Sequence, residues 1–259
     1  MIPTDLQKYK RLFVFGCSFT SYIWPTWADI LSKEMPQAEF FNFGHCGGGN
    51  LLMSIRVTEA NQRYTFKEDD LIVIMWTTFC REDRYISNNW LMTGNIFTAR
   101  HDYSDEFVRK YADTKGYLIR DLAIITQTTA YLNSLPCTGV TLASVPYHHQ
   151  QDMTDASIQP ILDLYKDTCQ ATPPCLYELE MKNEWTNGHV YINQGNSHQD
   201  YHPDPMRYCN YLSRLSFPIT NIGKEYALSS RAKLHNTKTR DEIVVVFADL
   251  ISSKTKTIL

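Results

Sequence analysis

The stretch that decides the fold is Leu12-Phe13-Val14-Phe15-Gly16-Cys17-Ser18-Phe19-Thr20, close to the N-terminus. Its apolar run predicts a short buried strand over residues 11–16. Gly16 ends the run and lets the backbone turn tightly. Ser18 therefore follows the carboxyl end of a strand, the edge at which open α/β sheets bind ligands. A serine delivered there on a tight turn acts as a nucleophile if a histidine reaches it.

The composition is that of an ordinary globular protein. The 259 residues are 43% hydrophobic and 20% charged, with a net charge of −3, which does not suggest a nucleic-acid surface. No apolar stretch approaches the ~20 residues that span a bilayer, and the polar N-terminus lacks a signal-peptide core. Seven cysteines without a C-x-x-C pair predict reduced thiols, not a disulfide framework or a zinc ribbon. We therefore expect a cytoplasmic protein without a membrane span.

Strands and helices alternate along the chain. Apolar runs predict further strands at 38–43, 71–76 and 139–145, and helical spacing predicts helices at 24–31, 51–62, 105–135, 156–165 and 204–215. Residues 84–103 lack a clean periodicity. We interpret them as a long excursion of the chain at the mouth of the predicted active site. Residues 177–184 stay undecided, and 243–248 fit a strand or a helix. The alternation predicts a three-layer α/β/α sandwich with a central, mostly parallel sheet of flavodoxin-like type.

A candidate base for Ser18 lies far downstream, in Asp200-Tyr201-His202-Pro203-Asp204-Pro205. His202 precedes a helix for which Asp204 is a candidate N-cap and Pro205 a favourable first residue. A carboxylate must orient the imidazole, and Asp200 is the first choice. Asp204 or a backbone carbonyl remains an alternative orienter.

Together, Gly16-Cys17-Ser18 and Asp200-x-His202-Pro203 resemble the SGNH (GDSL-like) hydrolase superfamily over about residues 10–215. The resemblance implies an SGNH hydrolase-like domain over residues 1–216, which leaves 217–259 as a C-terminal extension of unknown role. Here Cys17 replaces the usual Asp of the first block, as in a Gly-Cys-Ser-Phe-Thr variant of the family. The spacing from Asp200 to His202 is two residues, where the commonest family spacing is three.

The resemblance also implies an oxyanion hole. The backbone N–H of Ser18 is one expected donor, and a loop that begins at Asn42 aligns Gly47 with the family's oxyanion glycine. The family's third donor is an Asn after the strand that here ends at Trp76, and Thr78 stands in its place. A hydroxyl donates one hydrogen bond, so this departure affects rate more than fold.

Further residues at the predicted site edge are Arg81, which could bind an anionic group, and His148, a candidate substrate contact. Both have the plainer interpretation of solvated surface residues. No group of histidines has a known metal-ligand spacing, so we predict no metal and no cofactor.

The resemblance implies a serine esterase that hydrolyses short-acyl esters through a Ser18–His202–Asp200 triad and an acyl-enzyme. The generous aromatic content, with 16 Tyr and 5 Trp, favours carbohydrate O-acetyl esters among small-molecule or glycan substrates. Two alternatives stay open: an O-acyltransferase that uses the same Ser/His pair, and a non-catalytic binding protein on a hydrolase fold. The acyl group, the alcohol and the oligomeric state are not indicated by the sequence.

Overall fold

A parallel sheet of four strands forms the centre of the protein. The computed structural model describes residues 2–98, 103–146, 156–182 and 188–252. The sheet order is β2-β1-β3-β6, and all three neighbouring pairs are parallel. The strands are β1 (Arg11–Gly16), β2 (Glu39–Asn42), β3 (Asp70–Trp76) and β6 (Thr138–Ala143). Every residue of β3 is buried, as expected for a central strand covered on both faces.

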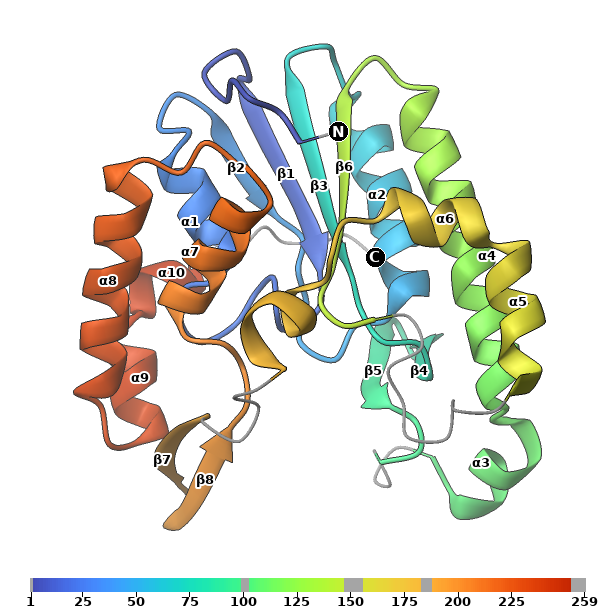
Figure 1. Cartoon of the computed structure of the whole chain (residues 1–259). Helices are drawn as coiled ribbons and strands as arrows, with labels where there is room; N and C mark the ends of the chain where they lie inside the picture. The colour runs from blue at the N-terminus through green and yellow to red at the C-terminus, as the bar shows by residue number, and fades with distance from the viewer. Residues whose placement is uncertain (1, 99–102, 147–155, 183–187, 253–259) are drawn as a thin grey trace.

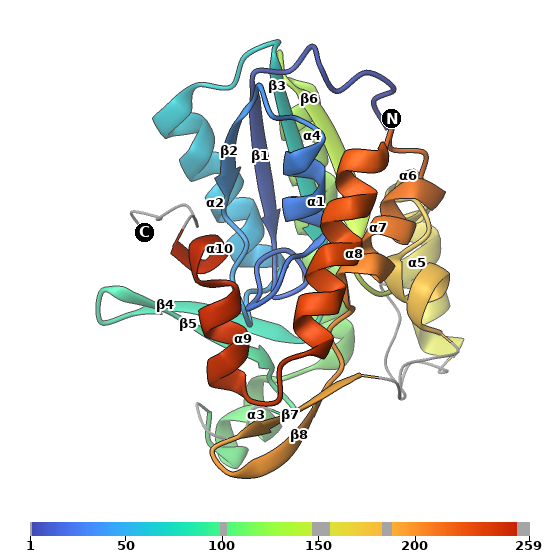
Figure 2. The ribbon, with the colours of Figure 1, turned by 90° about the vertical axis from the view of Figure 1, so that its left-hand side faces the viewer.

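Helices cover both faces of this sheet (Figure 1). On one side lie α1 (Trp27–Lys33), α7 (Pro205–Arg214) and α8 (Asn221–His235). On the other side lie α2 (Asn50–Tyr64) and α4 (Thr114–Asn133). In the turned view, α8 is the helix of the first group that lies nearest the viewer (Figure 2). The predicted three-layer α/β/α sandwich with a parallel central sheet is thereby confirmed.

The first helix starts later than predicted. Thr26 is its N-cap, and its side chain and the Asp29 side chain form a reciprocal capping box that makes Trp27 the first helical residue. Pro25, inside the predicted range of 24–31, therefore precedes the cap and lies outside the helix. The Thr26 hydroxyl also donates to the Thr20 carbonyl at 2.7 Å, which ties the helix start to the turn after β1.

Two β-hairpins were not predicted. Part of the segment interpreted as an excursion without periodicity pairs as β4 (Arg81–Ile86) with β5 (Asn89–Asn95). A second antiparallel pair, β7 (His189–Asn193) and β8 (Asn196–Asp200), comes just before His202. Both hairpins lie beyond the carboxyl ends of the sheet strands (Figure 1).

The helical segment predicted at 105–135 is two helices, α3 (Asp105–Tyr111) and α4, because Asp113 caps the start of α4. The next region contains a 3₁₀ turn, two short helices and a π-helical turn: Ala156–Ile158, α5 (Gln159–Leu164), α6 (Lys166–Ala171) and Tyr177–Met181. The undecided residues 177–184 thus include a π-helical turn within their described part.

The C-terminal extension packs onto the sandwich. α8 contacts α1 and α7, and it is followed by α9 (Arg240–Val246) and α10 (Ala248–Ser252). The run at 243–248 is therefore helical, because Thr239 and Glu242 form a capping box. A second apolar cluster joins the extension to the rest of the protein through Trp24, Tyr191, Leu234, Ile243 and Phe247. Among the described residues, no helix combines the length and apolar character that a membrane crossing requires.

Candidate active site

Ser18 sits in a tight turn directly after β1. The turn is closed by hydrogen bonds from the N–H groups of Thr20 and Ser21 to the Cys17 carbonyl, at 2.9 and 3.1 Å. A Cβ on Gly16 would lie 1.9 Å from Thr20 Oγ1, so this position accepts only glycine without rearrangement. Ser18 is 6% exposed. The strand end therefore holds the serine in one defined, largely buried place.

His202 and Asp200 are in direct contact. His202 Nδ1 lies 2.7 Å from Asp200 Oδ1, and the His202 backbone N–H donates to the same oxygen at 3.0 Å. The opposite ring nitrogen, Nε2, is buried and has no hydrogen-bond partner within the described part of the chain. An imidazole with an acidic partner on Nδ1 and a free Nε2 is suited to accept a proton.

The serine turn adjoins this imidazole. The ring of Phe19, which follows Ser18, has its centroid 5.1 Å from that of His202. Among the described residues, no hydrogen bond joins Ser18 itself to His202. Catalytic hydrogen bonds often tighten only when substrate is bound. The structure thus brings the turn that bears Ser18 next to the Asp200–His202 pair, although the two segments lie far apart in the sequence.

Two tyrosines complete the surroundings of the Asp200 carboxylate. The hydroxyl groups of Tyr22 and Tyr191 both donate to Asp200 Oδ2, the latter at 3.1 Å. Burial raises the pKa of Asp200, but the hydrogen bond and charge of His202, with the bond from Tyr22, outweigh it and lower the pKa to about 2. Asp200 is consequently a carboxylate at neutral pH.

Asp204, the alternative orienter, caps a helix and does not contact the imidazole. Its carboxylate accepts from the N–H groups of Met206 and Arg207, at 2.7 and 3.1 Å, and caps α7 as predicted. Pro205 is the first residue of that helix. Of the orienters left open by the sequence, Asp200 is the one that contacts the His202 ring.

The glycine-rich loop between β2 and α2 lies against the serine turn. The Asn42 side chain accepts from the Gly44 N–H at 2.9 Å and donates to the Thr20 carbonyl at 3.3 Å. Gly47 has φ +81°, a left-handed conformation that favours glycine. The backbone N–H groups of Ser18 and Gly47 have no acceptor among the described residues. Backbone donors without partners are uncommon inside proteins, so the N–H groups of the largely buried Ser18 and the half-buried Gly47 are available to an anion.

Of the other predicted site residues, Thr78 and Arg81 form hydrogen bonds to backbone carbonyls. The Thr78 hydroxyl follows β3 and donates to the Phe79 carbonyl at 3.1 Å. Arg81, the first residue of β4, donates to the Gly48 carbonyl at 2.9 Å and so contacts the glycine-rich loop. His148 lies outside the described residues.

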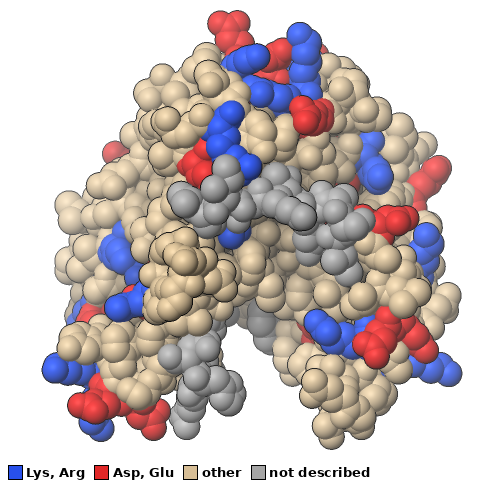
Figure 3. All heavy atoms as spheres, turned by 180° about the vertical axis from the view of Figure 1, so that it is seen from behind, with Lys and Arg blue, Asp and Glu red and all other residues tan. Residues whose placement is uncertain are grey.

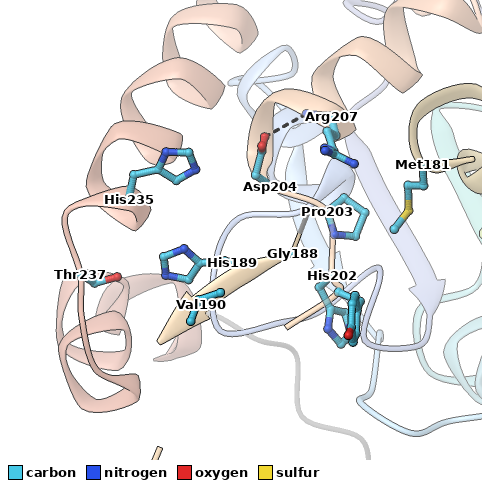
Figure 4. A pocket seen from close by; sticks show the side chains of 11 residues that line it. Met181, Gly188, His189, Val190, His202, Pro203, Asp204, Arg207, His235 and Thr237 are labelled. Carbon is cyan, nitrogen blue, oxygen red and sulfur yellow. Dashed lines mark hydrogen bonds between the residues drawn. The ribbon is translucent and has the colours of Figure 1, made fainter. Parts of the chain in front are cut away.

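A cavity of about 370 Å³ adjoins His202 on the side of the C-terminal extension. His189 from β7 and His235 from the end of α8 reach it with parallel rings whose centroids are 6.0 Å apart (Figure 4). Burial and the neighbouring His235 lower the pKa of His189. Seen from behind, the surface is also hollowed between the side that bears β7–β8 and the side that bears α3 and β4–β5 (Figure 3). In the described chain, no three His, Cys, Asp or Glu side chains are grouped to hold a metal ion.

The sequence did not reveal Tyr22, Tyr191 or Asp83, whose carboxylate binds the start of α2. The first two meet Asp200 only in three dimensions, and β8, with the sequence Asn-Ser-His-Gln-Asp, has no apolar alternation that would have predicted the hairpin. The one available signal for Asp83 was a carboxylate in the charged stretch after β3.

No protein-family model and no curated protein matches the sequence. Solved structures with a similar chain course include a member of the lipolytic protein G-D-S-L family from Veillonella parvula, at 12% identity and a TM-score of 0.45. The alignment covers 80% of this chain and 98% of that one. A catalytic mutant of an acetylxylan esterase from Geobacillus stearothermophilus aligns at 11% identity and a TM-score of 0.45, over 82% and 96% of the two chains.

Proposed function

We propose that this protein is a serine hydrolase of the SGNH (GDSL-like) type that cleaves short-acyl esters. The observation that carries the proposal is the Asp200–His202 pair, whose imidazole has a free Nε2 and packs against Phe19 of the turn that bears Ser18. The unpaired N–H groups of Ser18 and Gly47 supply the anion-binding element that acyl transfer requires.

In the proposed reaction, Ser18 Oγ attacks the ester carbonyl carbon while its proton passes to His202 Nε2. Asp200 stabilises the resulting imidazolium through Nδ1. The tetrahedral intermediate collapses as Nε2 returns the proton to the leaving alcohol oxygen, which leaves an acyl-Ser18 ester. A water molecule then attacks this ester, again giving its proton to Nε2, and the carboxylic acid departs as Ser18 regains its proton.

The backbone N–H groups of Ser18 and Gly47 are the proposed donors to the oxyanion. Thr78 is the proposed third donor, and it must turn its hydroxyl away from the Phe79 carbonyl to act. Two fixed donors and one adjustable donor predict a slower enzyme than one with three fixed donors, since each donor typically contributes about 10²–10³ in rate.

The proposed acyl group is small. Ser18 is largely buried, and the aromatic rings of Phe19 and Tyr22 lie within 5.1 and 3.8 Å of the His202 ring, measured between centroids. This crowding favours an acetyl group over a long chain. Acetylated carbohydrates and simple acetate esters are therefore the first substrates to test.

The test is intact-mass analysis after treatment with a fluorophosphonate, which phosphonylates an activated serine. We expect one adduct on the wild-type protein and none on Ser18→Ala or on His202→Ala, with all three proteins folded by circular dichroism. Hydrolysis of p-nitrophenyl acetate should follow the same pattern. A folded wild-type protein that takes up no adduct and releases no nitrophenol would refute the proposal.

A further inference from the structure

The hairpin β4–β5 forms a hydrogen bond to each of the three consecutive glycines of the glycine-rich loop, Gly47, Gly48 and Gly49. The Gly94 N–H donates to the Gly47 carbonyl at 3.2 Å, and the Arg81 guanidinium donates to the Gly48 carbonyl at 2.9 Å. The Gly49 N–H donates to Asp83 Oδ1 at 2.8 Å. An element that was absent from the sequence-based prediction thus fixes the loop that carries a candidate oxyanion donor.

Asp83 makes the most specific of these contacts. Besides Gly49, it accepts from the Leu52 N–H through Oδ2 at 3.0 Å. Gly49 is the N-cap residue of α2 and has no side chain with which to cap the helix, so Asp83 supplies that function from another strand. A carboxylate at a helix N-terminus is also favoured by the helix dipole.

The fit around Asp83 is tight. Asp83 is 4% exposed, and a Cβ built on Gly49 would lie 2.6 Å from Asp83 Oδ2. A Cβ on Gly47 would lie 2.8 Å from the Met92 carbonyl oxygen on the other strand of the hairpin. The backbone from Gly47 to Gly49 therefore has little freedom while Asp83 remains in place.

We propose that Asp83 is a positioning residue, which holds the loop 47–49 so that the Gly47 N–H stays unpaired and directed at the developing oxyanion. This inference rests on the proposed hydrolase function. Asp83 touches no reacting atom; it acts through the Gly49 and Leu52 N–H groups. A preorganised donor stabilises the transition state more than the bound ester, so its displacement lowers kcat with little effect on KM.

The test compares Asp83→Asn with Glu82→Gln. The asparagine keeps one carbonyl acceptor but turns an NH₂ group toward the second backbone N–H. Glu82 is the adjacent carboxylate on β4, and it contacts Arg84, Tyr117 and Arg120 instead of the glycine-rich loop. Both variants lose one negative charge from the same strand, so they differ in the contact to the loop.

Three measurements are made on the full chain: kcat and KM for p-nitrophenyl acetate, the rate of fluorophosphonate labelling, and amide hydrogen exchange of peptides that cover 46–53. In Asp83→Asn we expect kcat and labelling to fall about tenfold or more, KM to change less than about twofold, and exchange to accelerate. In Glu82→Gln all three should stay within about twofold of the wild type.

An Asp83→Asn variant with wild-type kcat would overturn the positioning role in an active enzyme. Unchanged amide hydrogen exchange at 46–53 in Asp83→Asn would show that Asp83 does not hold the loop, whether or not the protein is an enzyme. A wild-type protein that neither labels nor hydrolyses esters would instead refute the hydrolase proposal and with it the catalytic part of this inference, while the exchange data would still report on the loop.

Discussion

The phenol ring of Tyr22 lies flat against the imidazole of His202, with centroids 3.8 Å apart and planes inclined by 17°. The hydroxyl of the same tyrosine donates to Asp200 Oδ2, while His202 Nδ1 contacts Asp200 Oδ1. One side chain from the turn after Ser18 therefore orients both the proposed base and its carboxylate. It also links the N-terminal turn to a segment about 180 residues further along the chain.

Tyr22→Phe tests the hydroxyl without removing the stacked ring. A hydrogen bond to a charged acceptor contributes about 1.5–3 kcal/mol, so the loss should loosen Asp200 and lower kcat/KM about tenfold. Tyr22→Ala removes the ring as well and should cost more, because His202 gains freedom to rotate. Steady-state hydrolysis of p-nitrophenyl acetate measures both effects.

Tyr191→Phe is the matched control, since it removes the second hydroxyl on the same oxygen without a ring that stacks on His202. We expect it to reduce kcat/KM less than Tyr22→Phe. Equal losses in the two variants would show that the Asp200 hydrogen bonds act alike and that Tyr22 has no special orienting role.

Asp200→Asn should abolish most of the activity while the protein stays folded. The amide cannot stabilise a protonated His202 and can favour the wrong tautomer, a change that lowers kcat by up to about 10⁴ in a Ser-His-Asp enzyme. Asp204→Asn provides the comparison, because asparagine is also a good N-cap and Asp204 bonds α7 instead of the ring. Greater damage from Asp204→Asn than from Asp200→Asn would contradict the assigned orienter.

The strands of the central sheet were predictable because burial on both faces requires continuous apolar runs. Phe13 to Phe15 and Leu71 to Met75 are such runs, and every residue of both runs is buried. The position of Ser18 followed from the glycine after the first run. The His202 segment was recognisable through its resemblance to the Asp…His-Pro block of the SGNH family, and Asp204 and Pro205 correctly marked the helix start after it.

The hairpins were not predictable in the same way, because their strands depend on contacts that a local pattern does not contain. β8 consists of polar residues of which only Asp200 is buried, and it is held by pairing with β7. β4 begins with the charged residues Arg81 to Arg84, which resemble a solvated cluster until Asp83 meets the start of α2. The helix α9 did carry a local signal, the Thr239–Glu242 capping box.

Asp200 should make stability depend on pH in the acid range. Its pKa is lowered from 3.8 to about 2 in the folded protein, so the folded state holds its proton less tightly than the unfolded state. The stabilisation is present above the unfolded value near pH 4 and is lost as the pH falls toward 2. The shift corresponds to about 2 kcal/mol.

Urea unfolding of the wild type and of Asp200→Asn at pH 5 and near pH 2 measures this contribution. Because asparagine does not titrate, the free energy of unfolding of the wild type should fall by about 2 kcal/mol more than that of the variant. Parallel losses in the two proteins would show that Asp200 is not an acid-sensitive contact.

Gly16→Ala should disturb the serine turn. The added Cβ would meet Thr20 Oγ1 at 1.9 Å, and overpacking of this kind costs about 1–3 kcal/mol of unfolding free energy. We also expect slower fluorophosphonate labelling of Ser18. Gly116→Ala in the first turn of α4 is the control, because its Cβ would meet no atom nearer than 3.3 Å and alanine favours helix. Normal stability and labelling in Gly16→Ala would contradict the argument.

The C-terminal extension should stabilise the segment that holds Asp200 and His202. Ile243 of α9 is fully buried in a cluster with Trp24 and Tyr191. Trp24 donates to the Pro203 carbonyl at 2.9 Å, and Tyr191 donates to Asp200. The extension thus supports two residues that each form a hydrogen bond to the proposed catalytic segment.

Ile243→Ala should lower the free energy of unfolding by about 2–5 kcal/mol, because it leaves a cavity in this small cluster. Where the protein remains folded, kcat should fall as Trp24 and Tyr191 lose their support. Val245→Ala on the same helix is 74% exposed in the wild type and should change stability by less than about 0.5 kcal/mol. Loss of stability in Ile243→Ala with unchanged kcat would limit the extension to a structural role, because the geometry of Asp200 and His202 would then be independent of the cluster.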